Sequence, residues 1–104
     1  MKLFNIDHIP GSQLEALGLV KGTVVFSKNI GRDFMASVKT LVGGEIVSYT
    51  RMLDEARSIA TNRMISEALN LGADAIVNVR YSSSAVMSGA AEIVAYGTAV
   101  KIIE

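Results

Sequence analysis

The sequence predicts an α+β subunit of two layers, in which an antiparallel sheet packs against one long helix and a short helix. Three observations predict this fold. Residues 17–27 and 92–103 are rich in the β-branched and aromatic residues that favour strands. Apolar residues recur at helical spacing over 50–71. A turn-length connection joins the last two strands, so we expect them to pair antiparallel.

One domain covering residues 1–104 is expected, because no charge block, proline-rich run or internal repeat divides the chain. A domain of 104 residues can bury about two thirds of the surface of its unfolded chain. The composition therefore favours a single hydrophobic core.

The first strand is predicted over residues 17–27, where Val24, Val25 and Phe26 suit a half-buried pleated surface. Gly18 and Gly22 indicate a bend or a bulge within it.

A short helix is predicted next, over residues 30–41. Asn29 is placed to cap its first turn, and apolar residues follow at helical spacing. Gly43 and Gly44 should end this helix, because glycine adopts a positive φ without steric penalty.

A longer helix is predicted over residues 50–71, with Thr50 as its N-terminal cap and Gly72 as its C-terminal stop. Asp54 and Glu55 would then lie near its N-terminus, where the helix dipole favours carboxylates. One apolar stripe should face the core. It consists of Leu53, Ala56, Ala60, Met64, Ala68 and Leu71.

Ile65 and Leu69 lie outside this stripe and form a second apolar ridge on the helix. Either a partner subunit or a neighbouring segment of the same chain would cover them.

A third segment, residues 75–81, has the alternation of a half-buried strand. Regular alternation would turn Val77, Val79 and Tyr81 to one face and Ile76, Asn78 and Arg80 to the other. The serines at 82–84 are predicted to open a connection that ends by Gly89.

The closing strand, residues 92–103, has one bulky face and one small face. The long helix is expected to cover the bulky face, whereas the small face would permit close approach of another element. The bulky face consists of Val94, Tyr96, Thr98, Val100 and Ile102, and the small face of Ala95, Gly97 and Ala99.

Charge and composition exclude several classes of function. Ten basic residues balance ten acidic ones without clustering, so we expect neither nucleic acid nor an acidic membrane as a partner. Residues 1–10 lack the apolar core of a signal peptide, and no apolar run is long enough to span a bilayer. The absence of cysteine fits a reducing cytoplasm, which is the expected location.

Metal and nucleophile chemistry have few candidate residues. The chain has no cysteine, and His8, beside Asp7, is the single imidazole. His8 is therefore the one metal-ligand candidate, and we predict no catalytic residues and no cofactor.

One polar set is a candidate ligand site, because both predicted helices begin within it. It consists of Asn29, Arg32, Asp33, Tyr49, Asp54 and Arg57. The alternative is that these residues only cap helices and form ion pairs, such as Asp54 with Arg57 at i, i+3, each pair contributing about 0.3–0.5 kcal/mol.

Several motifs together resemble the YbjQ family (UPF0145) of small uncharacterised proteins. They are Asn29-Ile30-Gly31-Arg32-Asp33-Phe34, Val42-Gly43-Gly44, Tyr49, Ala56-Arg57, Leu71-Gly72-Ala73-Asp74-Ala75-Ile76-Val77 and Tyr96-Gly97-Thr98-Ala99-Val100. The resemblance implies a dodecin-like subunit assembled into a ring, commonly a pentamer. It also implies heavy-metal binding, although this chain offers one imidazole and no thiolate. It supplies no catalytic residues.

Three functions remain open at this point. The chain is expected to form a homo-oligomer that binds a small ligand or a metal ion at subunit interfaces. The alternatives are a structural or protein-interaction ring without a ligand, and an enzyme with an interface active site.

Overall fold

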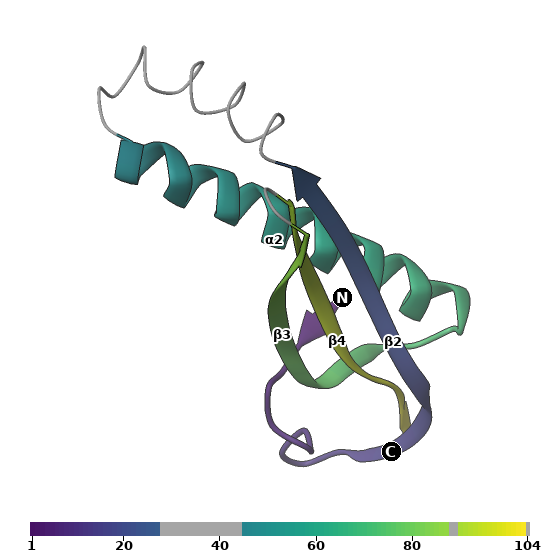
Figure 1. Cartoon of the computed structure of the whole chain (residues 1–104). Helices are drawn as coiled ribbons and strands as arrows, with labels where there is room; N and C mark the ends of the chain where they lie inside the picture. Colours follow the sequence, from purple (N-terminus) through teal and green to yellow (C-terminus); the bar gives the residue numbers. More distant parts are fainter. Residues whose placement is uncertain (28–44, 88–89, 104) are drawn as a thin grey trace.

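The computed structural model describes residues 1–27, 45–87 and 90–103. Within this part of the chain a four-stranded mixed sheet packs against one long helix, which crosses one face of the sheet (Figure 1). The elements are β1 (Lys2–Leu3), β2 (Gln13–Ser27), α2 (Glu45–Asn70), β3 (Ala75–Met87) and β4 (Ala90–Ile103). The predicted α+β class is confirmed. The predicted short helix at 30–41, with its cap Asn29, lies outside the described residues.

The strand order is β1-β3-β4-β2. The central strand β4 pairs antiparallel with both β2 and β3, as expected from the short connection between β3 and β4. The short β1, which was not predicted, pairs parallel with the start of β3. The sheet is therefore mixed, and the prediction of a wholly antiparallel sheet is wrong. β2 therefore forms one edge of the sheet. β1 forms the other edge beside Ala75 and Ile76, and beyond these residues β3 is itself the edge.

Strand β2 is longer than predicted and contains the predicted bulge. The register with β4 shifts between Ala16 and Gly18, and Gly18 has a φ of 137° that side chains rarely adopt. Gly22 has a different role, because a Cβ at this position would overlap the backbone of α2.

Helix α2 begins at Glu45, so the prediction that Thr50 caps it is wrong. No glycine or proline interrupts residues 45–70, and five residues before Thr50 continue the helical backbone. Asp54 and Glu55 consequently lie in the third turn, beyond the reach of the dipole at the N-terminus.

The C-terminal end of α2 agrees with the prediction. Gly72 has a φ of 79°, and its N–H donates to the carbonyl of Leu69 at 3.0 Å. The N–H of Ala73 donates to the carbonyl of Ala68 at 3.1 Å. These two bonds form a Schellman motif with glycine in the left-handed position.

The apolar stripe of α2 is largely confirmed. Four of its members are buried in the core, namely Ala56, Ala60, Met64 and Ala68. Leu53 is half-buried against them, whereas Leu71 is 48% exposed, because it lies in the capping turn after the helix has ended. Of the second ridge, Ile65 packs against the core of its own chain and Leu69 is 60% exposed.

Strand β3 departs from regular alternation at Asn78, which has a φ of 55°. The pairing with β4 skips from Val77 to Arg80, so a bulge lies between them. Ile76 and Val79 therefore share the core beneath α2, while Val77 lies in a cluster on the opposite face. The prediction that Val77 and Val79 face the same way is wrong.

The serines at 82–84 also differ from the prediction, because they belong to β3 and pair with β4. A run of serines is polar enough for a turn, but here pairing with the long strand β4 keeps all three in the sheet. The strand then continues to Met87.

The helix covers the small face of β4, and the prediction that it covers the bulky face is wrong. Ala95 and Ala99 are fully buried in one cluster with Ala60 and Met64 of α2. Small side chains on both elements allow helix and sheet to approach closely, which buries more of each surface. The bulky face of the sheet is thus left on the outside.

The N-terminal segment covers one end of this outer face. Phe4 and Ile9, together with Leu14 of β2, pack there against a small cluster of Ala75, Val77 and Val100. The remainder of the outer face keeps large apolar side chains in solvent, including Leu19 and Tyr96.

Candidate functional site

The predicted polar set is brought together only in part. Asp54 and Arg57 form an ion pair of 2.6 Å between Oδ1 and Nη2, and both side chains are exposed. Tyr49 lies in the first turns of α2, and its side chain is not described. Asn29, Arg32 and Asp33 lie outside the described residues.

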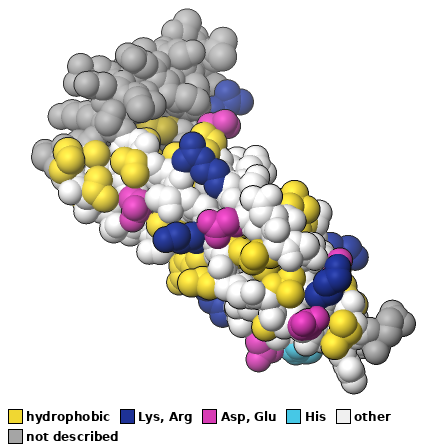
Figure 2. All heavy atoms as spheres, turned by 90° about the vertical axis from the view of Figure 1, so that its right-hand side faces the viewer, with side chains coloured by type: hydrophobic (Ala, Val, Ile, Leu, Met, Phe, Trp, Pro, Cys, Tyr) yellow, Lys and Arg dark blue, Asp and Glu magenta, His cyan; other side chains and the backbone are white. Residues whose placement is uncertain are grey.

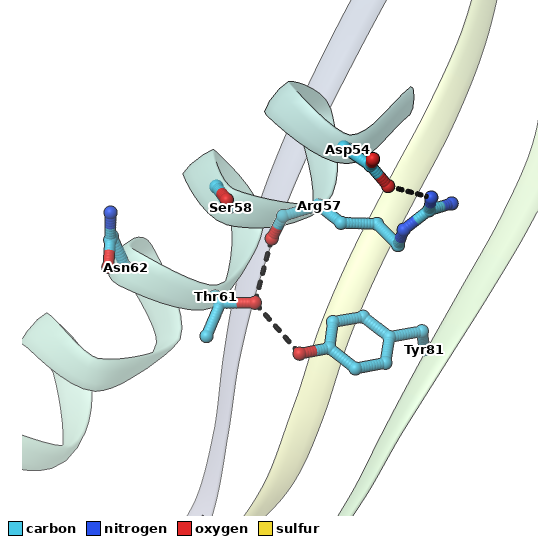
Figure 3. Close-up of a pocket in the computed structure, with 6 residues that line it drawn as sticks. All are labelled: Asp54, Arg57, Ser58, Thr61, Asn62 and Tyr81. Carbon is cyan, nitrogen blue, oxygen red and sulfur yellow. Dashed lines mark hydrogen bonds and ion pairs between the residues drawn. The ribbon is translucent and has the colours of Figure 1, made fainter. Parts of the chain in front are cut away.

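A polar hollow of about 480 Å³ lies beside this ion pair, between α2 and β3 (Figure 3). Its lining consists of Asp54, Arg57, Ser58, Thr61, Asn62 and Tyr81. Five of these residues belong to two and a half consecutive turns of α2, and the sixth, Tyr81, belongs to β3. The hollow is shallow and largely open to solvent.

Thr61 and Tyr81 hold the two walls together. The Thr61 hydroxyl donates to the carbonyl of Arg57 at 2.7 Å, and Thr61 Oγ1 lies 2.8 Å from the Tyr81 hydroxyl. Because the Thr61 proton is already used, the Tyr81 hydroxyl is the donor of the second bond. The phenol oxygen of Tyr81 keeps its lone pairs to accept a bond from a ligand.

Sequence reasoning missed Thr61 and Tyr81. With regular alternation in β3, Tyr81 and Ile76 would face opposite sides of the sheet. The bulge at Asn78 turns both to the side of α2. No local signal in the sequence marks this bulge, since asparagine only tolerates a left-handed conformation better than most residues.

A second hollow of about 460 Å³ lies on the other side of Tyr81. It is mostly apolar and is lined by Leu3, Phe4, Asn5, Ile6, Val79 and Tyr81. The N-terminal segment forms its wall and is fixed to the β3 bulge, because the N–H of Asn78 donates to the carbonyl of Ile6 and the N–H of Val79 to that of Phe4, both at 2.9 Å. Tyr81 thus lines both a polar hollow and an apolar one.

His8 pairs with its neighbour, with 2.9 Å between Nδ1 and Asp7 Oδ1. The hydrogen bond from His8, with its charge, lowers the pKa of the Asp7 carboxyl below its usual value. Both side chains are exposed. Within residues 1–27, 45–87 and 90–103, no three His, Cys, Asp or Glu side chains come together in a group that would hold a metal ion.

The surface charge is mixed. On the face drawn in Figure 2, basic and acidic side chains lie interspersed over the described part of the chain. In the same part of the chain, no helix has the length and apolar character needed to cross a membrane.

Comparisons with known proteins cover the whole chain. Residues 1–103 match the model of the YbjQ family, which is described as "Putative heavy-metal-binding". A UPF0145 protein of Clostridium novyi is 57% identical over 103 residues, which cover 99% of this chain and 100% of that protein. A UPF0145 protein of Thermotoga maritima is 58% identical and covers 98% of this chain and 97% of its own length.

A solved structure has the same fold. It is a protein of unknown function of the DUF74 family from Pediococcus pentosaceus, with a TM-score of 0.71 at 17% identity. The match covers 99% of this chain and 98% of the other.

Proposed function

This chain belongs to the YbjQ (UPF0145) family, and from that premise we propose that it is a non-enzymatic homo-oligomer, a dodecin-like ring of five subunits, that binds a small ligand in the polar hollow beside Tyr81. Such a ring joins one surface of each subunit to a different surface of the next, and this contact can complete sites that are open on a single chain.

The observation that carries the proposal is the uncovered outer face of the sheet. Leu19 is 72% exposed, Val25 is 54% exposed and Tyr96 is 38% exposed. In the β2–β4 register, Leu19 pairs with Thr98 and Val25 with Glu92, so Leu19 and Val25 lie on the same face as Tyr96. Leu19 and Tyr96 are diagonal neighbours on this face, whereas Lys21 and Thr23 lie between Leu19 and Val25 along β2. Neighbouring apolar side chains that are exposed on a sheet face suit an interaction surface.

The polar hollow offers donors and acceptors without a net charge. Arg57 neutralises Asp54, and Ser58, Asn62 and the Tyr81 oxygen add neutral hydrogen-bonding groups. This composition favours a small polar ligand. A second subunit over the open side would exclude water and strengthen each hydrogen bond.

Assembly is tested first by light scattering, which we expect to report several subunits for the parent protein. Leu19→Lys should lower the measured mass, because a charge would be buried in the interface. Leu71→Lys is the matched control, since Leu71 is also exposed but lies in the capping turn that follows α2. A parent that stays monomeric at high concentration would contradict the proposal.

Ligand binding is tested by a thermal-shift screen of small polar metabolites. A compound that binds only the folded state raises the melting temperature. At a concentration a hundredfold above its Kd it stabilises the folded state by about 2.7 kcal/mol. We expect Tyr81→Phe to reduce this shift without changing the assembly. If the protein assembles and no compound shifts its melting temperature, the ring has a structural or protein-interaction role.

The residues of this chain do not fit a soft heavy metal. Zn²⁺ and Cu⁺ select thiolate and imidazole ligands, and zinc sites need three or four ligands around one centre. This chain has no cysteine and one histidine. His8 is exposed, with Asp7 as its hydrogen-bond partner.

We therefore expect no sub-micromolar Zn²⁺ binding when metal-free protein is titrated by calorimetry. His8→Ala is the control. Tight binding in the parent that is lost in His8→Ala would contradict the prediction and would place the site where copies of His8 meet in the assembly.

A further inference from the structure

Strand β2 forms an edge of the sheet, with β4 on one side only among the described residues. An edge strand presents unpaired N–H and C=O groups, and these attract strands of other molecules. β2 is long for an edge strand, at 15 residues. An edge of this length favours pairing with strands of other molecules unless its backbone groups are covered.

Two side chains of α2 cover the middle of this edge. The N–H of Lys21 donates to Glu67 Oε1 at 3.1 Å, and Arg63 Nη1 donates to the carbonyl of Thr23 at 2.5 Å. Lys21 and Thr23 are two residues apart, so their backbone groups point to the same side of the strand, away from β4. Arg63 and Glu67 are one helical turn apart and reach both groups.

Gly22 makes this arrangement possible. A Cβ at Gly22 would overlap the carbonyl oxygen of Ala60 and the amide nitrogen of Met64 and would lie 2.8 Å from the Cβ of Arg63. The helix backbone therefore lies directly on the strand between Lys21 and Thr23. The side chains of Arg63 and Glu67 are therefore close enough to reach the backbone groups at the edge of the strand.

We propose that Arg63 and Glu67 are edge guards, which prevent β2 from pairing with β2 of a second copy of this chain. A second copy is the natural partner, because each copy presents the same long edge and an antiparallel β2–β2 pair is self-complementary under a two-fold axis. The guards occupy the donor of Lys21 and the acceptor of Thr23, which such a pair would use. They thereby restrict association to other surfaces.

The test compares Arg63→Ala/Glu67→Ala with the parent by light scattering at equal concentration. We expect the double variant to have at least twice the mass of the parent, whatever the parent's own assembly. Arg51→Ala/Glu55→Ala is the matched control, because it removes the same two charges at the same spacing from the exposed surface of α2. The control should keep the parent mass.

Lys21→Pro, added to the double variant, removes the backbone N–H that the new pair needs. It should restore the parent mass, and circular dichroism verifies that each variant is folded. Should the double variant not fold, Arg63→Ala alone exposes the Thr23 carbonyl and is measured in the same way. The proposal is overturned if the folded variant without Arg63 and Glu67 keeps the parent mass. It is also overturned if the mass of the control rises equally, or if Lys21→Pro does not reverse the rise.

Discussion

Gly22→Leu is expected to destabilise the subunit more than any other substitution considered for the sheet. The first carbon of the new side chain would overlap the carbonyl oxygen of Ala60 and the amide nitrogen of Met64. Both are backbone atoms of a helix, and they cannot move unless α2 lifts off the sheet. Overpacking a core costs about 1–3 kcal/mol and occasionally more. Here we expect a loss above about 3 kcal/mol, a large part of the 5–15 kcal/mol that is typical of a domain.

The measurement is denaturant unfolding followed by circular dichroism. Glu15→Leu is the matched control, because it places the same side chain at an exposed position of the same strand. Its free energy of unfolding should stay within about 0.5 kcal/mol of the parent value. A stable Gly22→Leu protein would show that α2 does not lie on β2 at this point.

Gly97→Leu should destabilise the subunit by about 1–3 kcal/mol through overpacking. A Cβ at Gly97 would lie 2.8 Å from Cγ2 of Ile76 and 2.9 Å from the carbonyl oxygen of Val77. The close neighbour is the bulged stretch of β3, and part of the contact is with a side chain that can rotate. We therefore expect a smaller loss than for Gly22→Leu.

Thermal unfolding of Gly97→Ala and Gly97→Leu tests the crowding at this position. The loss should grow with the size of the side chain, since each added carbon lies closer to Ile76 and Val77. Ser83→Leu, at an exposed position of β3, is the control and should be nearly neutral. If the parent, the two Gly97 variants and the control are equally stable, then the small face of β4 can accept a larger side chain at this position.

Local signals in the sequence predicted individual elements well. Gly18 marked the bulge in β2 and Gly72 the end of α2, because each backbone conformation requires a positive φ that glycine adopts without strain. The helical spacing of the alanines in α2 predicted the stripe that faces the core. Thr50 failed as a cap, because capping residues are also tolerated inside a helix whose preceding residues are helical.

The candidate site could be predicted only along the helix. Asp54 and Arg57 are three residues apart on one helix, and this spacing alone brings their side chains together. Tyr81 joins them from a strand 20 residues beyond Thr61 in sequence. No pattern within either segment specifies that contact, because it depends on where α2 crosses the sheet.

The sequence by itself therefore determined the α+β class, the main body of α2, β2 and β4 and the two faces of β4, since side-chain periodicity is a property of each segment alone. Only the tertiary structure decided which face of β4 lies under the helix. Hydrophobicity favoured the bulky face, but Gly22, Ala95 and Ala99 meet the alanines of α2 and let the two backbones come together. Close packing between small side chains outweighed the burial of larger ones, and this left Leu19, Val25 and Tyr96 on the outer surface.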